Sequence, residues 1–130
     1  MSTAATPVNA SAPLKVEWHA DNVNDRYYAY LHFNEVEKLA ENETRSFNIT
    51  VNGHFTFGPE IPVYQSVSTI FTTKPWTGAK SYIISLFKAE NSTHPPILNA
   101  IEIYKVIDFS LPETQQDGKL ALYFVVSFVV

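Results

Sequence analysis

Cysteine is absent from this chain of 130 residues, and glycine is scarce, with four residues. Without cysteine the protein has no disulfide bond, no thiolate nucleophile and no cysteine-ligated zinc. The glycines form no dinucleotide-binding fingerprint, and the sequence contains neither a phosphate-binding loop nor a G-x-S-x-G nucleophile motif. We therefore expect a protein that is not an enzyme, with no catalytic residue, no cofactor and no metal site.

The chain also has few positively charged residues and lacks a long apolar run. Nine lysines and arginines stand against 13 aspartates and glutamates, so the net charge of −4 disfavours binding to nucleic acid. The most apolar stretch, Leu120–Val130, has eleven residues, all apolar except Ser127, whereas a membrane span needs about 20. Residues 1–13 are small, polar and uncharged, which is unlike a secretory signal. We expect neither a signal peptide nor a transmembrane span within these residues.

What the chain does contain favours a single all-β domain. Fifty residues are β-branched or aromatic, against 20 that are alanine, leucine or methionine. Short β-type runs separated by turn residues recur about every ten residues, which is typical of a sandwich or barrel. The expected strands are Leu14–Trp18, Arg26–Asn34, Arg45–Asn52, His54–Phe57, Tyr64–Thr73, Ser81–Lys88 and Asn99–Val106.

Local patterns refine this expectation. Large groups on both faces of Arg26–Phe33 predict a central strand between two layers, and Asn52-Gly53 predicts a tight hairpin turn. Proline places Gly58-Pro59 and Pro95-Pro96 in loops, because it cannot donate a backbone hydrogen bond. The acidic stretch Glu35–Glu43 predicts a solvated loop or one helical turn.

Aromatic residues supply the candidate binding site. Aromatic faces with a polar rim commonly hold sugar rings and peptide side chains. Trp76, in the expected loop Lys74–Gly78, is the first candidate, since packing alone explains an exposed loop aromatic poorly. Tyr28, Tyr30 and Tyr64 are the further ligand-binding candidates, although most aromatics of a small sandwich serve its core.

Four Asn-x-Ser/Thr motifs are N-glycosylation candidates, at Asn9, Asn42, Asn48 and Asn91. The alternative is coincidence in a cytosolic protein. Asn42 and Asn91 lie in expected turns, where a glycan projects into solvent, and Asn48 lies on the expected wet face of a strand.

Two patterns that suggest metal binding are rejected. Asp21-x-Asn-x-Asp25 has the first ligand spacings of a calcium loop, but Arg26 stands where that loop needs glycine and His32 where it needs glutamate. We expect a capped turn there. The four histidines show no metal-ligand spacing.

Several of these segments together resemble a known family. They are Trp18, Asp21, Asp25, Tyr27–Phe33, Arg45–Ile49, Asn52-Gly53, Gly58-Pro59 and Asn91–Tyr104. The chain resembles the second, C-terminal lobe of the malectin-like extracellular region of plant leucine-rich-repeat receptor-like serine/threonine kinases.

The resemblance implies a jelly-roll-like β-sandwich outside the plasma membrane that binds a ligand without enzymatic activity. The implied ligand is a cell-wall carbohydrate or a peptide, and a co-receptor or a second malectin-like lobe is an implied partner. Full-length relatives carry a kinase domain, whose phosphate- and magnesium-binding residues are absent from this sequence. The alternative is a structural lobe that orients or pairs receptors without contacting ligand.

The resemblance also divides the chain into three parts. We expect a flexible arm at residues 1–13, a malectin-like lobe at residues 14–117 and an apolar tail outside the family pattern at residues 118–130. The tail has two interpretations: a last buried strand, or the product of a truncated reading frame, since GGT-AAG, the form of an unspliced intron donor, encodes Gly118-Lys119.

Overall fold

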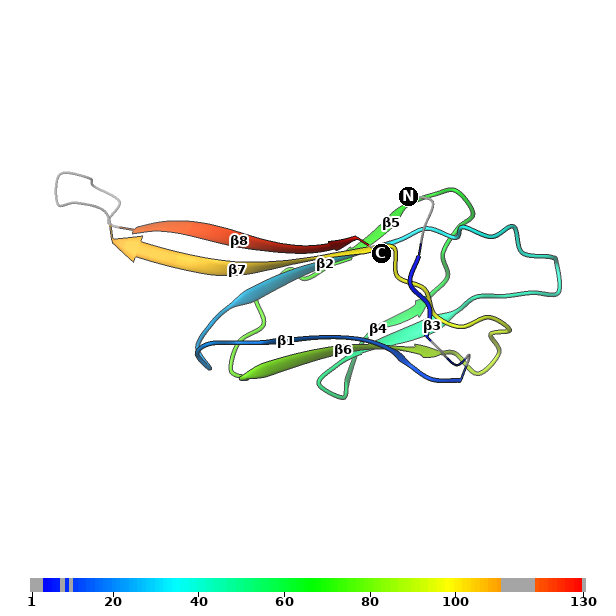
Figure 1. Cartoon of the computed structure of the whole chain (residues 1–130), viewed down its shortest axis with the longest axis horizontal. Helices are drawn as coiled ribbons and strands as arrows, with labels where there is room; N and C mark the ends of the chain where they lie inside the picture. Colours follow the sequence, from blue (N-terminus) through cyan, green and yellow to red (C-terminus); the bar gives the residue numbers. More distant parts are fainter. Residues whose placement is uncertain (1–3, 8, 10, 111–118, 130) are drawn as a thin grey trace.

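Two four-stranded antiparallel sheets make up the protein, and the computed structural model describes residues 4–7, 9, 11–110 and 119–129. One sheet has the order β1 (Leu14–His19), β6 (Ser81–Lys88), β3 (Phe47–Val51) and β4 (His54–Glu60). The other has the order β5 (Ser68–Phe71), β2 (Tyr27–Phe33), β7 (Ala100–Ser110) and β8 (Lys119–Val129). Figure 1 shows the sheets as two facing layers, with the β7–β8 hairpin projecting beyond them. The predicted all-β sandwich is confirmed.

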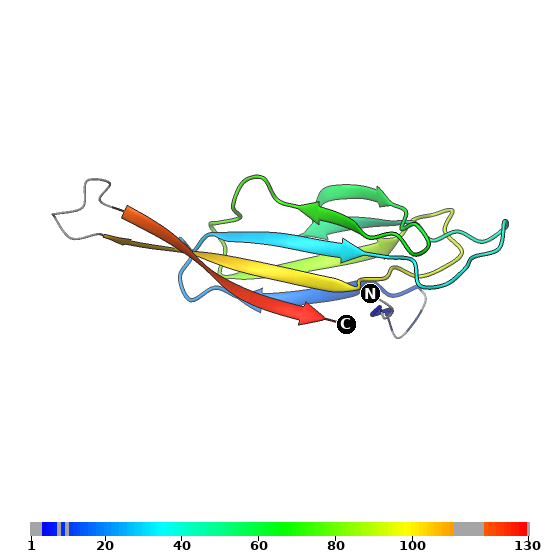
Figure 2. The same cartoon turned by 90° about the horizontal axis from the view of Figure 1, so that it is seen from above.

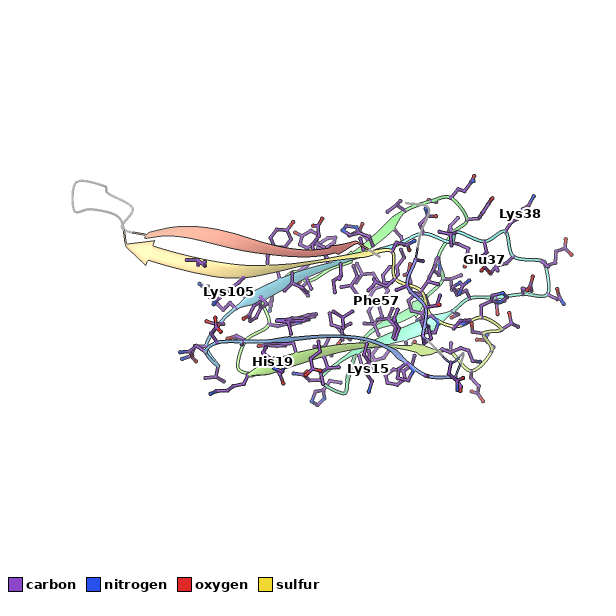
Figure 3. The ribbon with its side chains drawn as sticks, viewed as in Figure 1. Lys15, His19, Glu37, Lys38, Phe57 and Lys105 are labelled. Atoms are coloured by element: carbon purple, nitrogen blue, oxygen red, sulfur yellow. The ribbon has the colours of Figure 1, made fainter. Side chains whose placement is uncertain are left out.

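Strand alternation explains where the core lies. Successive side chains of a strand point to opposite faces, so Ala29, Leu31 and Phe33 of β2 all point toward the second sheet and are buried. Phe33 packs against Phe47 of β3, with ring centroids 5.3 Å apart. Burying an aromatic side chain of this size stabilises the fold by about 1.5–3 kcal/mol. Figure 3 shows the side chains that fill the space between the layers.

The two sheets also have two open flanks. Figure 2 shows β4 and β5 along one long edge of the sandwich, with β1 and β8 along the other. β2 is central in its sheet, between β5 and β7, as the sequence predicts. The expectation that β2 lies between two layers is wrong, however, because Tyr30 on its outer face is 36% exposed. This open outer face becomes important for the candidate site.

The predicted β3–β4 hairpin is confirmed, but its second strand is longer than expected. Asn52 and Gly53 have φ angles of 49° and 81°, as a two-residue turn of this type requires. Gly58-Pro59, predicted to lie in a loop, instead belongs to β4. Proline is tolerated there because β4 is an edge strand with register irregularities opposite β3. At Gly58, where φ is 143°, an added Cβ would lie 2.9 Å from Asn48 Cα, so only glycine fits.

The predicted strand Tyr64–Thr73 is too long. Gln65 has a φ of 55°, and the Ser66 N–H donates to the Val63 carbonyl at 3.1 Å, which makes a tight turn before β5 begins at Ser68. A residue in the left-handed region cannot continue a strand.

Both chain ends are paired where they are described. In the arm, Ala5 and Leu98 exchange two backbone hydrogen bonds, of 2.8 and 3.1 Å. In the tail, β8 pairs with β7 from Lys119 opposite Ser110 to Val129 opposite Ala100, so this segment is an edge strand. The proposed boundary between lobe and tail, at residues 117 and 118, lies outside the described residues. The truncated reading frame stays a hypothesis.

Candidate functional site

Aromatic side chains from three neighbouring strands gather on the outer face of the sheet that contains β2. The register places Phe71 of β5 beside Tyr30 of β2, and Tyr104 of β7 beside Tyr28 of β2. With Thr72 and Thr73, these residues line a groove of about 500 Å³. We call this set of residues the tyrosine face: Tyr28, Tyr30, Phe71, Thr72, Thr73 and Tyr104.

Ring contacts hold the tyrosine face together. Tyr30 stacks on Phe71 with centroids 5.7 Å apart and meets Tyr104 edge to face at 5.4 Å. These arrangements suit the quadrupoles of aromatic rings and add about 0.5–1.5 kcal/mol per pair beyond area burial. Phe71 nevertheless remains 55% exposed. The face is therefore an ordered aromatic surface that is open to a ligand.

Polar groups border these rings. The Tyr104 hydroxyl donates to Glu102 Oε2 at 2.7 Å, and this hydrogen bond raises the pKa of Tyr104. Glu102 Oε1 lies 3.8 Å from His32 Nε2, and His32 Nδ1 lies 2.9 Å from Thr69 Oγ1. A row of hydrogen-bonding groups thus runs along the same outer face. Stacking surfaces beside such groups suit a ligand with an apolar face and polar edges.

Trp76, the first candidate from the sequence, lies on the other side of the sheet. Its backbone exchanges two hydrogen bonds with Tyr27, of 2.8 and 2.9 Å, which continues the sheet edge beyond β5. Its ring stacks on Trp18 and Tyr82, with centroids 6.1 and 6.4 Å apart. The expectation of an exposed side chain is wrong, because Trp76 is half-buried against the core. Its role as a contact residue stays a prediction.

Trp76 also lines a second cavity, of about 340 Å³, which opens between the edges of the two sheets. Phe71, Thr72 and Thr73 line both cavities, so the end of β5 and the two residues after it separate them. Tyr64, by contrast, is 44% exposed and pairs with Glu35 beyond the C-terminal end of β2. The structure therefore brings Tyr28 and Tyr30 together and leaves Tyr64 and Trp76 outside their groove.

Sequence reasoning missed Phe71, Tyr104 and Glu102. Glu102 is directly opposite Tyr30 in the β2–β7 register. Alternation in each strand marks these residues as outward-facing, but it does not say which strands are neighbours.

A buried ion pair lies at the end of the sandwich opposite Lys105, where Figure 3 labels Glu37. Arg45 Nε donates to Glu35 Oε2 at 2.6 Å, and both side chains are 3% exposed. Arg45 Nη1 also donates to the Pro95 carbonyl at 2.7 Å, and the Glu37 N–H donates to Glu35 Oε1 at 3.1 Å. The predicted solvated loop is therefore wrong at Glu35, whose charge is buried with its partners.

The four glycosylation candidates differ in exposure. Asn9, Asn42 and Asn91 are exposed, whereas Asn48 is half-buried in β3. The Thr44 hydroxyl donates to the Asn91 carbonyl at 3.1 Å, which brings the two motifs at Asn42 and Asn91 to the same end of the molecule.

The predicted turn at Asp21–Asp25 is formed. Asp25 Oδ2 accepts the Asn22 N–H at 3.0 Å and lies 3.4 Å from Lys105 Nζ. The backbone hydrogen bond from Asn22 is the main cause that lowers the pKa of Asp25, and Lys105 adds to it. Among the described residues, no three His, Asp or Glu side chains are grouped to hold a metal ion.

The fold and the site define a β-sandwich module with an aromatic outer face. The chain belongs to the malectin-like domain family, whose profile matches residues 1–106. The malectin-like domain is a non-catalytic module of the carbohydrate-binding type, and in receptor kinases it lies outside the membrane. Within the described ranges, no helix is long and apolar enough to cross a membrane.

Proteins similar in sequence to this chain include plant receptor kinases. The chain is 46% identical over 118 residues to a probable LRR receptor-like serine/threonine-protein kinase of Arabidopsis thaliana, and 43% identical over 122 residues to a second one. These matches cover 89% and 92% of this chain but 13% and 14% of the relatives, so the chain spans about one seventh of their length. The match lies in the malectin-like region and not in the kinase domain. No solved structure matches the chain significantly.

Proposed function

We propose that this chain is an extracellular ligand-binding module that holds a cell-wall glycan on the tyrosine face. The observation that carries the proposal is the ordered aromatic groove, in which Tyr30 contacts both Phe71 and Tyr104. Its volume of about 500 Å³ lies within the usual range for ligand sites, about 300–1,000 Å³. Membership of a carbohydrate-binding type of family supports the same ligand class.

The chemistry of the tyrosine face matches a sugar ring. The C–H face of a pyranose is apolar and packs on aromatic rings, while its hydroxyls point outward and need hydrogen-bond partners. Thr72, Thr73 and Tyr104 line the groove, and the Tyr104 hydroxyl is hydrogen-bonded to the Glu102 carboxylate at its edge. The Thr72 hydroxyl oxygen accepts the Ala29 N–H at 3.1 Å. These hydroxyls and this carboxylate are the polar partners proposed for the sugar. Neutral sugars with equatorial hydroxyls, such as β-linked glucose oligomers, present both features at once.

The test is binding of the full chain to a plant glycan array, followed by calorimetry with the best oligosaccharide. Tyr30→Ala removes the central ring of the face, and we expect it to weaken binding at least tenfold, which corresponds to about 1.4 kcal/mol. Tyr64→Ala is the matched control, because Tyr64 is an exposed tyrosine outside the groove. We expect its affinity to stay within twofold of that of the unaltered chain.

Two outcomes would contradict the proposal. Equal losses for Tyr30→Ala and Tyr64→Ala would show that the tyrosine face is not the site. Absence of binding to every glycan would favour the second candidate, a lobe that orients or pairs receptors. The exposed apolar residues along β4 and β5, which include Phe55, Phe57 and Phe71, favour that candidate because such surfaces suit protein contacts.

A further inference from the structure

The outer strand β5 presents an open backbone edge. Among the described residues β5 pairs with β2 and with no second strand. The Thr72 N–H donates to the Ala29 carbonyl at 3.1 Å, so the backbone of Thr72 faces β2. Backbone direction alternates along an antiparallel strand, and the N–H and C=O groups of Thr69 and Phe71 therefore face away from β2. These groups can pair with another extended chain.

An apolar cleft lies directly inside this open edge. The cavity of about 340 Å³ between the sheets opens between Phe57 of β4, which is 41% exposed, and Phe71 of β5. We call it the flank cleft. Its walls include inward-facing residues of both sheets: Leu31, Ile49, Val51, Ile70 and Trp76. Lys74 is the one charged residue among the described residues that line it.

The combination of edge and cleft defines an occupant. An added strand lies about 4.8 Å beyond β5, and its side chains alternate between the two faces of the sheet. One set of side chains then points into the flank cleft, and the other lies beside the exposed ring of Phe71. We propose that β5 binds an extended peptide segment of a protein partner by strand addition, with an apolar side chain of leucine or phenylalanine size in the flank cleft.

The neighbouring edge on the same flank is a poorer template for a peptide. β4 has register irregularities, and Pro59 within it has no N–H to donate. An edge of this kind resists pairing with a further strand. The flank cleft lies between β4 and β5, and β4 is the poorer template. The peptide is therefore placed along the β5 edge.

This inference goes beyond glycan binding and does not depend on it. Strand addition uses the backbone edge of β5 and the space between the sheets, whereas the proposed sugar site uses the outer face of β2 and β7. The two sites share Phe71, Thr72 and Thr73. A glycan and a peptide that both contact Phe71 are expected to compete.

The test uses the full chain labelled with ¹⁵N. The ligand is a seven-residue peptide with both ends blocked, in which four threonines alternate with valine, leucine and valine. We expect amide shifts at residues 69–73 and a dissociation constant below about 1 mM. Two further peptides carry N-methyl groups at alternate positions, one on the threonines and one on the apolar residues. In an added strand only alternate N–H groups face β5. We therefore expect N-methylation to weaken binding at least tenfold in one of these peptides and to leave the binding of the other unchanged.

A matched pair of protein variants tests the same edge. Thr69→Pro removes the outward N–H, and Thr69→Val keeps it while removing the hydroxyl that contacts His32. We expect Thr69→Pro to weaken peptide binding at least tenfold and Thr69→Val to change it less than twofold. If Thr69→Pro fails to fold, the two N-methylated peptides decide the question on the unaltered chain.

Four results would overturn the inference: no shifts at residues 69–73, shifts confined to β8, equal effects of both N-methylated peptides, or full binding by a folded Thr69→Pro variant. Tyr28→Ala separates the two proposals, since it lies in the sugar groove and outside the flank cleft. Loss of glycan binding with intact peptide binding in Tyr28→Ala is expected. Failure of glycan binding in every variant would leave the peptide result unaffected.

Discussion

Replacing Arg45 by methionine is expected to lower the free energy of unfolding by about 3–5 kcal/mol, because it leaves the Glu35 carboxylate buried without its partner. Both side chains are 3% exposed, and the Arg45 Nε to Glu35 Oε2 distance is 2.6 Å. Arg45→Met also removes the hydrogen bond to the Pro95 carbonyl. For a chain of this size we expect the melting temperature to fall by about 10–20 °C.

A double-mutant cycle separates the unpaired charge from lost packing. Glu35→Gln removes the negative charge and keeps an oxygen for the Glu37 N–H, which donates to Glu35 Oε1 in the native chain. The Arg45→Met/Glu35→Gln variant buries no isolated charge. We expect it to be more stable than the sum of the two single losses predicts, by about 1–3 kcal/mol.

Urea unfolding followed by tryptophan fluorescence measures these differences, since Trp18 and Trp76 stack on each other inside the sandwich. The slope of free energy against urea must stay constant for the comparison to hold. A loss below 1 kcal/mol for Arg45→Met, or simple additivity in the double variant, would refute the reasoning that an unpaired Glu35 charge dominates.

Four further predictions concern other parts of the chain. Tyr82→Phe should change stability by less than about 1 kcal/mol, measured by thermal unfolding, because the buried hydroxyl has no hydrogen-bond partner among the described residues; a larger loss would contradict this. The pKa of Asp25 is lowered in the folded chain. The ionised carboxylate therefore stabilises the fold at pH values above the pKa of Asp25 in the unfolded chain, and this stabilisation is lost as the pH falls through the pKa in the folded chain. Asp25→Asn should therefore destabilise the chain near neutral pH and not in strong acid, and a constant difference across pH would argue against it. Deleting residues 119–130 should raise the soluble fraction of the protein, since an apolar edge strand promotes aggregation. If circular dichroism shows instead that the shortened chain is unfolded, β8 is essential to the fold. In a secretory host, Asn42 and Asn91 should carry glycans, seen as a mass shift that an endoglycosidase removes and that the two Asn→Gln variants lose.

Local features of the fold could be predicted from the sequence because their causes are local. The Asn52-Gly53 turn needs two residues with positive φ, and this dipeptide supplies them most readily. Alternation along β2 identified Tyr27, Ala29, Leu31 and Phe33 as one face, and all four are buried. Period-two patterns contain enough information to orient a strand.

The errors arose where distant residues decide the structure. Glu35 is buried because Arg45 and Pro95 approach it from two other segments, and composition alone marks it as solvated. Proline in β4 is tolerated because that strand lies at an edge, which depends on strand order. The tyrosine face likewise depends on register, since Phe71 and Glu102 flank Tyr30 from strands far away in the sequence.

The inner aromatic cluster determines which tyrosine of β2 faces outward. Tyr27 packs edge to face on Trp18 and Tyr82, so its neighbour Tyr28 must point to the opposite face of the sheet. Trp76 stabilises this arrangement, because its backbone bonds to Tyr27 and its ring stacks within the cluster. Trp76→Ala can therefore weaken glycan binding without any contact between Trp76 and the sugar.

Two measurements separate these roles of Trp76. If Trp76 acts through the position of β2, then glycan affinity and melting temperature fall together, and binding of the apolar peptide side chain falls as well. If Trp76 contacts ligand only in the flank cleft, peptide affinity falls while glycan affinity is kept. A fall in glycan affinity at unchanged melting temperature would instead place Trp76 in contact with the sugar, which contradicts its position on the inner side of the sheet.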